Sequence, residues 1–348
     1  MISFDNNMKK TWPKVSIITA TLNSERTIAE YFKAIKSQRY KGEIEILILD
    51  GGSTDKTLEV AKENGAKIYS NKLKTAEAGK ALGVKKSSGT VFALIDSDNV
   101  LPNNTWLKDL VRPFTEDSEI IASEPIRFTY RKSDHWLTRY FALIGMGDPT
   151  NLFIGNYDKY NYITNKWTNL KLCEERKNGY LKIKLEDKIP TIGANGFLIR
   201  KDALKTYPLG DYLFDVDLIE TLVKKGSIYI AKVDTSIVHL FSGDVGTFIR
   251  KQRRRIRDYL YHYYYKKTKE TENSLESPLI FFGILKFIVS CLLIAPLLYQ
   301  ALLGFNRKSD IAWFFHPIAC LITLFAYAYE TIRSIFIHEE YSRVGWRQ

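Results

Sequence analysis

The sequence predicts an α/β domain with a mostly parallel central sheet, followed by a transmembrane helical hairpin near the C-terminal end. Two observations predict this arrangement. Short apolar runs alternate with amphipathic stretches over roughly the first hundred residues, which is typical of the strands and helices of a doubly wound sheet. Two later apolar stretches, residues 278–305 and 311–329, each approach the roughly 20 residues that span a bilayer core.

The predicted strands and helices alternate along the chain. Strands are expected at residues 15–20, 44–49, 66–69 and 91–95. Helices are expected after Ser24, after Ser53 or Thr54, over residues 75–86 and over residues 102–114. Ser24 and one of Ser53 or Thr54 are expected to cap their helices, because such side-chain oxygens accept hydrogen bonds from first-turn N–H groups. Parallel strands bring their carboxyl ends to one edge of the sheet, where ligands bind in such folds.

Composition restricts the class of protein. A net charge of +12 and a pI of about 9.3 favour an anionic partner, which could be a nucleic acid, an anionic lipid or a phosphorylated substrate. The three cysteines, Cys173, Cys291 and Cys320, are too few and too scattered for a disulfide framework or a zinc cluster. The first residues lack an apolar core, so no cleaved secretory signal is expected.

The fourth predicted strand ends on Asp96-Ser97-Asp98. Two carboxylates at a strand end suit Mg²⁺ or Mn²⁺, ions that usually bind together with substrate phosphates. Taken alone, such a pair more often caps the following loop. Polar residues also end the first two strands, at Thr21 and Asn23 and over residues 50–55, so a nucleotide crevice is predicted. Neither G-x-G-x-x-G after the first strand nor G-x-x-x-x-G-K-[ST] occurs, so neither a dinucleotide site nor a P-loop is supported.

Residues 15–23, 50–55 and 95–98 together resemble the family 2 inverting glycosyltransferases, which have the GT-A fold. The order and spacing of the three motifs agree with that family across residues 15–115 and more loosely to about residue 260. The resemblance implies a nucleotide-sugar donor and Mg²⁺ or Mn²⁺ as cofactor. Ala20 and Leu22 stand where the family usually has Pro and Tyr, so the identity of the nucleotide base stays open.

The resemblance also implies roles for donor-site residues. Asp50 is expected to contact the nucleotide base, and Asp98, with Asp96, to hold the metal. His239 is expected to complete the metal shell, although a histidine at a strand end is commonly structural. The predicted nucleotide-binding residues are Thr19, Thr21, Asn23, Glu25, Asp50, Ser53, Asp55, Lys80 and Asp96.

Two later motifs resemble the acceptor side of the same family. Residues 192–200, with Gly193 and Asn195, resemble the Gly-rich strand that lines the acceptor pocket. Residues 214–222 resemble the helix start that carries a Glu-Asp base motif, with Phe214 in place of the Glu. Asp215 is therefore the predicted base, and Asp217 the alternative; either could instead cap the helix. A polyprenyl phosphate, already anionic, would need little base catalysis.

A basic segment follows, with six cations among residues 250–257. Gln252 and Arg255 resemble a Q-x-x-R-W motif with Ile256 in place of Trp, which implies a contact to the donor diphosphate or to an acceptor phosphate. A basic juxtamembrane helix attracted to anionic lipid is a second interpretation and does not exclude the first. Without the Trp, processive polymer synthesis is less favoured.

The predicted organisation places a catalytic domain at residues 1–245, with a donor half at 13–115 and an acceptor half at 116–245. A basic juxtamembrane helix follows at 246–277, then two transmembrane helices within 278–331 and a tail at 332–348. The positive-inside rule puts the catalytic domain and the tail in the cytoplasm. Lys286 and Pro296 leave open a first segment that is tilted, kinked or re-entrant, and a buried core hairpin is a further alternative.

The function predicted from the sequence is transfer of a sugar from a nucleotide-sugar donor to a membrane-borne acceptor, either a polyprenyl phosphate or a lipid-linked glycan. No nucleic-acid partner is expected. A processive polysaccharide synthase and a metal-dependent nucleotidyltransferase are alternatives, although the sequence lacks the Lys/Arg-bearing Gly-rich loop usual in the latter. A non-catalytic basic membrane scaffold would leave the Asp-x-Asp at a strand end unexplained.

Overall fold

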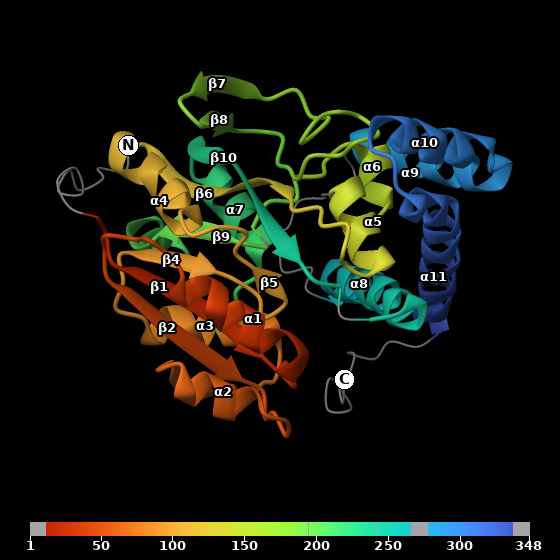
Figure 1. Cartoon of the computed structure of the whole chain (residues 1–348). Coiled ribbons are helices and arrows are strands. Elements are labelled where there is room, and N and C mark those ends of the chain that lie inside the picture. Colours follow the sequence, from red (N-terminus) through yellow and green to blue (C-terminus); the bar gives the residue numbers. More distant parts are fainter. Residues whose placement is uncertain (1–11, 194, 242, 266–277, 337–348) are drawn as a thin grey trace. The chain divides into compact units, whose positions relative to one another are not determined.

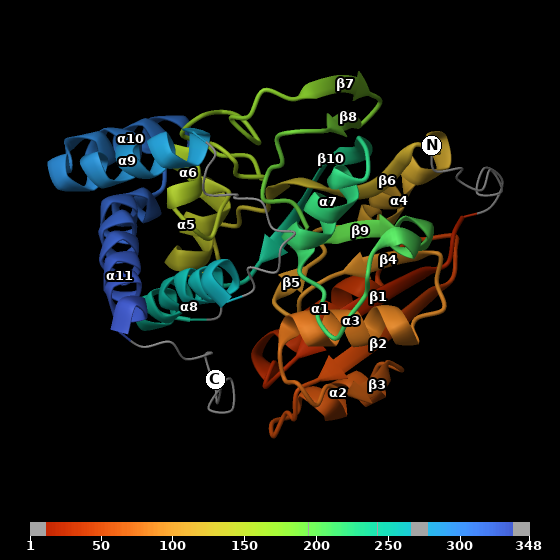
Figure 2. The same cartoon turned by 180° about the vertical axis from the view of Figure 1, so that it is seen from behind.

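The computed structural model describes residues 12–193, 195–241, 243–265 and 278–336, which form two compact units (Figure 1, Figure 2). The sheet unit contains described residues up to Thr129 and Leu170–Leu240, and the helical unit contains those of Tyr130–Asn169 and from Phe241 onward. The predicted tail beyond residue 336 and the last part of the predicted juxtamembrane helix, 266–277, lie outside the described residues.

The first half of the sheet unit has the predicted alternation of strands and helices. Its strands are β1 (Val15–Thr21), β2 (Ile44–Asp50), β3 (Lys67–Ser70) and β4 (Val91–Leu94). Its helices are α1 (Glu25–Lys36), α2 (Thr57–Glu63), α3 (Ala76–Lys86) and α4 (Trp106–Glu116). The four strands pair in parallel in the order β3-β2-β1-β4, so the prediction for this half is confirmed. Every residue of β4 is buried, as expected for a central strand.

Of the predicted helix caps, Ser24 occupies the N-cap position of α1, whereas neither Ser53 nor Thr54 is the N-cap of α2. Ser24 precedes α1, but its side chain makes no capping hydrogen bond and its Oγ instead lies 2.9 Å from Oγ of Ser97. Neither Ser53 nor Thr54 caps α2, which begins three residues later, because the Ser53 hydroxyl donates to Asp50 instead. The Ser24 hydroxyl therefore connects two loops and the Ser53 hydroxyl bonds within its own turn, and neither satisfies a first-turn N–H group of a helix.

Beyond β4 the sheet is mixed, which corrects the expectation of a mostly parallel sheet. Over the described residues it has ten strands, in the order β3-β2-β1-β4-β9-β6-β10-β8-β7, with β5 paired to β10. The added strands are β5 (Asn99–Val100), β6 (Ile120–Phe128), β7 (Cys173–Lys177), β8 (Tyr180–Leu185), β9 (Phe197–Arg200) and β10 (Ile228–His239). Strand β9 lies antiparallel between β4 and β6, and β7 and β8 form a hairpin. Hairpins of this kind need no crossover helix, whereas parallel pairs do.

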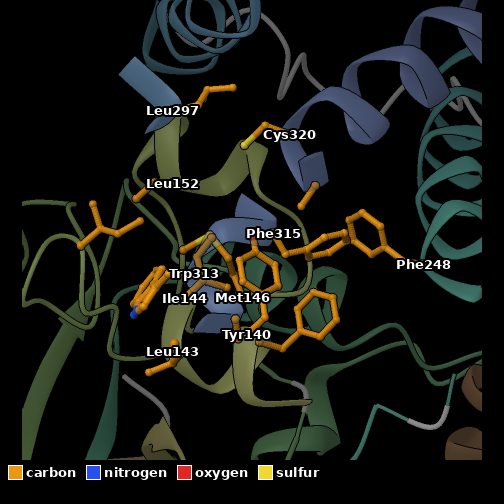
Figure 3. Close-up of a cluster of buried hydrophobic side chains, with 14 of the residues drawn as sticks. Tyr140, Leu143, Ile144, Met146, Leu152, Phe248, Leu297, Trp313, Phe315 and Cys320 are labelled. Atoms are coloured by element: carbon orange, nitrogen blue, oxygen red, sulfur yellow. The ribbon is translucent and has the colours of Figure 1, made fainter. Parts of the chain in front are cut away.

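The helical unit joins two distant parts of the sequence. Its helices are α5 (Trp136–Ile144), α6 (Thr150–Ile154), α8 (Val245–Tyr265), α9 (Pro278–Leu293), α10 (Ala295–Arg307), the 3₁₀ helix η4 (Ile311–Phe315) and α11 (His316–Phe336). Residues 130–169, assigned from the sequence to the acceptor half, belong to this unit. Their side chains Tyr140 and Leu152 share one apolar cluster with Trp313 and Phe315 (Figure 3).

The predicted hairpin of two transmembrane helices is not confirmed. The first apolar stretch is broken at Ile294, where α9 and α10 meet at 95°. Ile294 has φ +60°, and Pro296 two residues later has no N–H group for a continuous helix. Within the described residues, Ile311–Phe336 is the one continuous helical stretch long and apolar enough to cross a membrane, and the bent pair could form a second crossing. The kinked or re-entrant alternative for the first stretch therefore agrees with the structure.

Candidate functional site

The carboxyl ends of β1, β2 and β4 are joined by hydrogen bonds between their loops. Asn23, with φ +50°, accepts a hydrogen bond from the Thr54 N–H at 2.9 Å, and its own N–H donates to Ser53 Oγ at 2.9 Å. The Ser24 and Ser97 hydroxyls lie 2.9 Å apart, which connects the first strand end to the Asp-x-Asp loop. The three polar strand ends therefore lie together at one edge of the sheet, as the sequence predicts.

Asp50 shapes the turn that follows β2. Its Oδ2 accepts hydrogen bonds from the N–H groups of Gly52 and Ser53, both at 2.8 Å. Its Oδ1 accepts from the hydroxyls of Thr21 at 3.0 Å and Ser53 at 2.5 Å. Gly52 has φ +101°, a conformation that glycine adopts without strain. Asp50 is thus buried and held in one orientation at the strand end.

Two further predicted nucleotide-binding residues, Asp55 and Thr19, make hydrogen bonds that hold the loops and strands around β1. Asp55 accepts hydrogen bonds from the N–H groups of Glu25 and Thr57, both at 3.0 Å. Burial alone would raise the pKa of the Asp55 carboxyl, but these hydrogen bonds lower it below its ordinary value. Thr19 is fully buried in β1, and its hydroxyl donates to the Ile95 carbonyl at 2.7 Å. Thr19 therefore holds β1 against the segment that leads to the Asp-x-Asp.

Asp98 lies beside His239. The antiparallel pairing of β5 with β10 places Asn99 opposite His239, and the Leu240 N–H donates to the Asp98 carbonyl at 2.8 Å. The His239 Nε2 atom is 3.6 Å from Asp98 Oδ2. Among the described residues, no three His, Cys, Asp or Glu side chains come together as a metal-binding group. Asp98 and His239 thus provide two adjacent donors, and Asp96 does not join them as a third.

Lys80 connects the donor motif to the acceptor motif. Its Nζ lies 2.5 Å from Asp215 Oδ2 and 4.0 Å from Asp96 Oδ1. The Lys80 and Asp215 side chains are only 8% and 13% exposed. Burial disfavours the charged lysine, but the two carboxylates outweigh it and raise the pKa of Lys80 above its ordinary value. Lys80 therefore stays charged beside both motifs.

Asp215 is the first residue of α7 (Asp215–Lys224), and one of its two carboxylate oxygens has no hydrogen-bond partner among the described residues. Burial raises the pKa of its carboxyl to about 6; Lys80 opposes this shift, whereas Asp96 and Glu77 add to it. Its Oδ1 is buried and has no hydrogen-bond partner among the described residues. A β-carbon at Gly193, which has φ +122°, would lie 2.5 Å from Asp215 Cβ. Gly193 therefore lets the base motif approach the Gly-rich loop closely.

Other acceptor-side residues are placed as follows. Asp217 is exposed. Asn195, with φ +60°, accepts a hydrogen bond from Asn99 Nδ2 at 3.1 Å. Asn99 is fully buried, and its Nδ2 also lies 3.3 Å from Asp98 Oδ1. Sequence reasoning did not assign Asn99 a role, although it directly follows the Asp-x-Asp; a polar residue at that position was the available signal.

Gln252 and Arg255 lie on α8, in the helical unit. Gln252 is fully buried and donates to the Gly147 carbonyl at 3.0 Å. Arg255 Nη1 donates to the same carbonyl at 2.5 Å and to Gln252 Oε1 at 3.1 Å. A side chain at Gly147 would clash with the Arg255 guanidinium, 2.5 Å from the ideal Cβ position. These two residues therefore form one bonded group with Gly147, and their contact to a phosphate stays a prediction.

Comparison with known proteins identifies relatives of this site and fold. A profile of the family described as "Glycosyl transferase family 2" matches residues 16–207. Glycosyltransferase AglE of Haloferax volcanii is 28% identical over 146 residues, which are 40% of this chain and 48% of that protein. A Methanococcus voltae protein is 33% identical over 108 residues, covering 29% of this chain and 33% of its own length. It is named dolichyl N-acetyl-alpha-D-glucosaminyl phosphate 3-beta-D-2,3-diacetamido-2,3-dideoxy-beta-D-glucuronosyltransferase.

The chain thus spans less than half the length of these curated relatives. Among solved structures, mannosyltransferase PcManGT from Pyrobaculum calidifontis, in complex with GDP-Man and Mn²⁺, is similar with a TM-score of 0.51 at 12% identity. The alignment covers 94% of this chain and 90% of that one. This similarity shows a shared fold of the GT-A type with a mixed sheet.

Proposed function

This chain belongs to glycosyl transferase family 2, and from that premise we propose that it transfers a sugar, with inversion, from a nucleotide-sugar donor to a membrane-borne acceptor. The observation that carries the proposal is the meeting of the Asp50 turn, the Asp-x-Asp and Asp215 in one unit, bridged by Lys80. The base must lie next to the donor site, because it takes a proton from the acceptor while the acceptor attacks the donor sugar.

The donor end of the site suits a nucleoside diphosphate and a divalent cation. Asp98 and His239 offer an oxygen and a nitrogen ligand 3.6 Å apart, both partly exposed, and Mg²⁺ or Mn²⁺ fits such a pair when phosphates and water supply the other ligands. A bound ion would offset negative charge on the departing nucleoside diphosphate. Asp50 and the joined loops of β1 and β2 would hold the nucleoside, and the charged Lys80 would lie beside the phosphates. The complex of PcManGT with GDP-Man and Mn²⁺ supports this class of donor.

Asp215 is the proposed base. With a pKa of about 6 its carboxylate is mostly ionised at neutral pH, and its unbonded Oδ1 can accept the proton of an acceptor hydroxyl. Oδ2 is held by Lys80, so the orientation of the carboxylate is fixed before the acceptor arrives. A base built in this way favours a hydroxyl acceptor, as in a lipid-linked glycan, over an anionic polyprenyl phosphate. The name of the Methanococcus relative, which specifies a dolichyl sugar phosphate, supports an acceptor of that kind.

A membrane location supports a lipid-linked acceptor. The cations at residues 250–257 would attract anionic lipid, and Arg255 has N–H groups beyond Nη1 for a phosphate. The crowding of cations on this side of the apolar helices favours a cytoplasmic face for the catalytic site.

The test uses purified full-length protein in detergent with Mn²⁺, a panel of nucleotide sugars and a panel of lipid acceptors. We expect nucleoside diphosphate release with at least one donor, and faster release when a lipid-linked glycan is added. Asp215→Asn should reduce transfer to a hydroxyl acceptor by at least a hundredfold, while the exposed Asp217→Asn serves as the matched control. Release with no donor of the panel would overturn the transferase proposal, and undiminished transfer by Asp215→Asn would remove Asp215 as the base.

A further inference from the structure

The C-terminal half of α11 is bound to α8 by ion pairs around the buried Glu330. Glu330 is 1% exposed and accepts hydrogen bonds from Arg253 and Arg257, the latter through Nη2 at 2.7 Å. Arg333 lies 3.6 Å from the same carboxylate. An unpaired buried charge is strongly destabilising, so this cluster fixes the end of α11 on α8.

The segment that leads into α11 is attached to a different part of the helical unit. Asp310, which precedes η4 and α11, accepts hydrogen bonds from Arg139 Nε at 2.8 Å and from the Tyr130 hydroxyl at 2.5 Å. Farther along, His316 Nδ1 lies 3.0 Å from the Tyr140 hydroxyl. The start of α11 is therefore attached to the segment that includes α5. In Figure 1 and Figure 2, α11 extends from the end of α10 to α8.

The residues that hold Asp310 and those that hold Glu330 lie on the same side of any membrane that the protein binds. One residue separates Tyr130 from the last residue of β6, and five residues separate the last residue of β10 from the first of α8. Even fully extended, a five-residue connection reaches only about 20 Å, which is less than the roughly 30 Å of a bilayer core. Helix α8 does not cross either, because six cations lie within residues 250–257. Tyr130 and Arg253 are thus on the side of the sheet unit.

The two attachment points of the segment that contains η4 and α11 are far apart. Twenty positions separate Asp310 from Glu330, and a helical segment of that length extends roughly 30 Å. A helix whose ends are 30 Å apart and on the same side of a membrane lies along the surface and does not cross. We propose that α9, α10 and α11 insert into one leaflet of an anionic phospholipid membrane, with α11 along its surface, and do not form the spanning hairpin expected from the sequence.

The exposed side chains fit this arrangement. On α9, Phe281, Phe282, Leu292 and Leu293 are 62–73% exposed, and the last residue of α11, Phe336, is 79% exposed. Helices α9 and α10 have 16 and 13 residues, or roughly 24 and 20 Å, and meet at 95°, so neither alone reaches across a bilayer. Apolar faces of this kind bury themselves at the boundary between headgroups and acyl chains.

Charge identifies the lipid as anionic. Three arginines surround the Glu330 carboxylate, and residues 250–257 contain six cations and no carboxylate. Tyr329, 57% exposed, lies under the Arg253 guanidinium at 4.9 Å from the ring centre, an arrangement typical of the lipid headgroup region. Each cation near an anionic lipid surface adds to the attraction between the protein and that surface.

Cysteine labelling of sealed vesicles decides between the two topologies. The native Cys173 is exposed on β7 and reports the side of the sheet unit. Ser309→Cys, made in a Cys173→Ser background, reports the exposed connection between α10 and α11, and Asn306→Cys repeats the measurement at a second exposed position. We expect an impermeant maleimide to label these sites from the same side as Cys173. Labelling from the opposite side would establish a spanning hairpin and overturn the proposal.

Vesicle flotation tests the apolar surface independently of any enzymatic activity. Detergent-purified protein is mixed with vesicles of phosphatidylcholine alone or with phosphatidylglycerol, and detergent is removed. We expect at least tenfold more protein on the anionic vesicles, and at least a tenfold loss for Leu292→Glu combined with Leu293→Glu. Leu73→Glu, at a 46% exposed leucine of the sheet unit, is the matched control and should bind like the wild type. Equal binding by the α9 variant, with unchanged circular dichroism, would overturn the proposal, whether or not a sugar donor is found.

Discussion

Replacing Lys80 by methionine tests the link between the donor and acceptor motifs. Methionine keeps the length and the apolar stem of the buried side chain but removes the ammonium that lies 2.5 Å from Asp215 Oδ2. Without that charge, Asp215 stays buried, and the negative charges of Asp96 and Glu77 still repel its carboxylate. All three effects disfavour its ionised form, so the pKa of Asp215 must rise.

The size of the effect follows from the pKa of about 6 that Asp215 has with Lys80 present. Two unit charges about 4 Å apart interact by about 4 kcal/mol at an effective dielectric constant of about 20, and one pKa unit is about 1.4 kcal/mol. Water entering the site will recover part of this energy, so we expect a rise of one to two units, to about 7–8. At pH 6.5 the ionised fraction of Asp215 then falls about threefold for a pKa of 7 and about 25-fold for a pKa of 8, whereas at pH 9 it is nearly unchanged.

The assay is the pH profile of kcat/KM for transfer to a hydroxyl acceptor, measured for wild type, Lys80→Met, Lys80→Arg and Lys85→Met. Lys85 is the matched control, because it lies on the same helix and pairs at 3.5 Å with an exposed aspartate, an interaction of little energy. We expect the acid limb to move upward in Lys80→Met only, with activity recovered at high pH. An acid limb that stays near pH 6 in Lys80→Met would refute the assignment of Asp215 as the base or of Lys80 as the residue that sets its pKa.

The same pKa shift predicts a stability profile. Because the folded-state pKa of Asp215 is raised above the unfolded value, stability should fall as pH rises from about 4 to 6, and in Lys80→Met the fall should continue to about pH 8; urea titrations at pH 5 and pH 8 measure it. Asp98→Ala should abolish both nucleoside diphosphate release and the thermal shift produced by Mn²⁺; a retained shift would show that the ion binds elsewhere. Gly193→Ala should lower kcat at least tenfold with little change in donor KM, because its β-carbon would meet Asp215 at 2.5 Å and its φ of +122° strains alanine; unchanged kcat would show that the loop relaxes without moving Asp215. Glu330→Gln should destabilise the protein by about 1.5–3 kcal/mol in denaturant unfolding, since it removes the buried carboxylate that accepts hydrogen bonds from the partly exposed Arg253 and Arg257, and a loss below 1 kcal/mol would contradict this role of Glu330.

Local sequence patterns were sufficient for the donor half of the fold. Strands β1 to β4 are short apolar runs separated by helices, and parallel pairing follows from that alternation alone. The mixed half could not be predicted in the same way. Strand β9 pairs with β4 although Val91 and its partner Arg200 are 109 positions apart, and a four-residue strand carries too little pattern to show its direction.

The candidate site divides in the same way. Asp50, Asp96 and Asp98 were found because they directly follow apolar strands, and the structure places all three in the sheet unit. The contact of Lys80 with Asp215 joins residues 135 positions apart and has no local signature. The break at Ile294 is an intermediate case: Pro296 left a kink open in the sequence analysis, but only the structure gives the 95° bend between α9 and α10.

The Lys80–Asp215 pair also bears on the choice between the two acceptor classes. A buried ion pair is rarely worth more than apolar residues of the same shape, so stability alone does not account for it. The unbonded Asp215 Oδ1 adds a further penalty of about 1–3 kcal/mol. An acceptor hydroxyl donating to Oδ1 would remove that penalty, whereas a phosphate would bring a negative charge against a carboxylate. The arrangement therefore favours a sugar hydroxyl of a lipid-linked glycan, and we expect added polyprenyl phosphate to be the poorer acceptor in a direct competition.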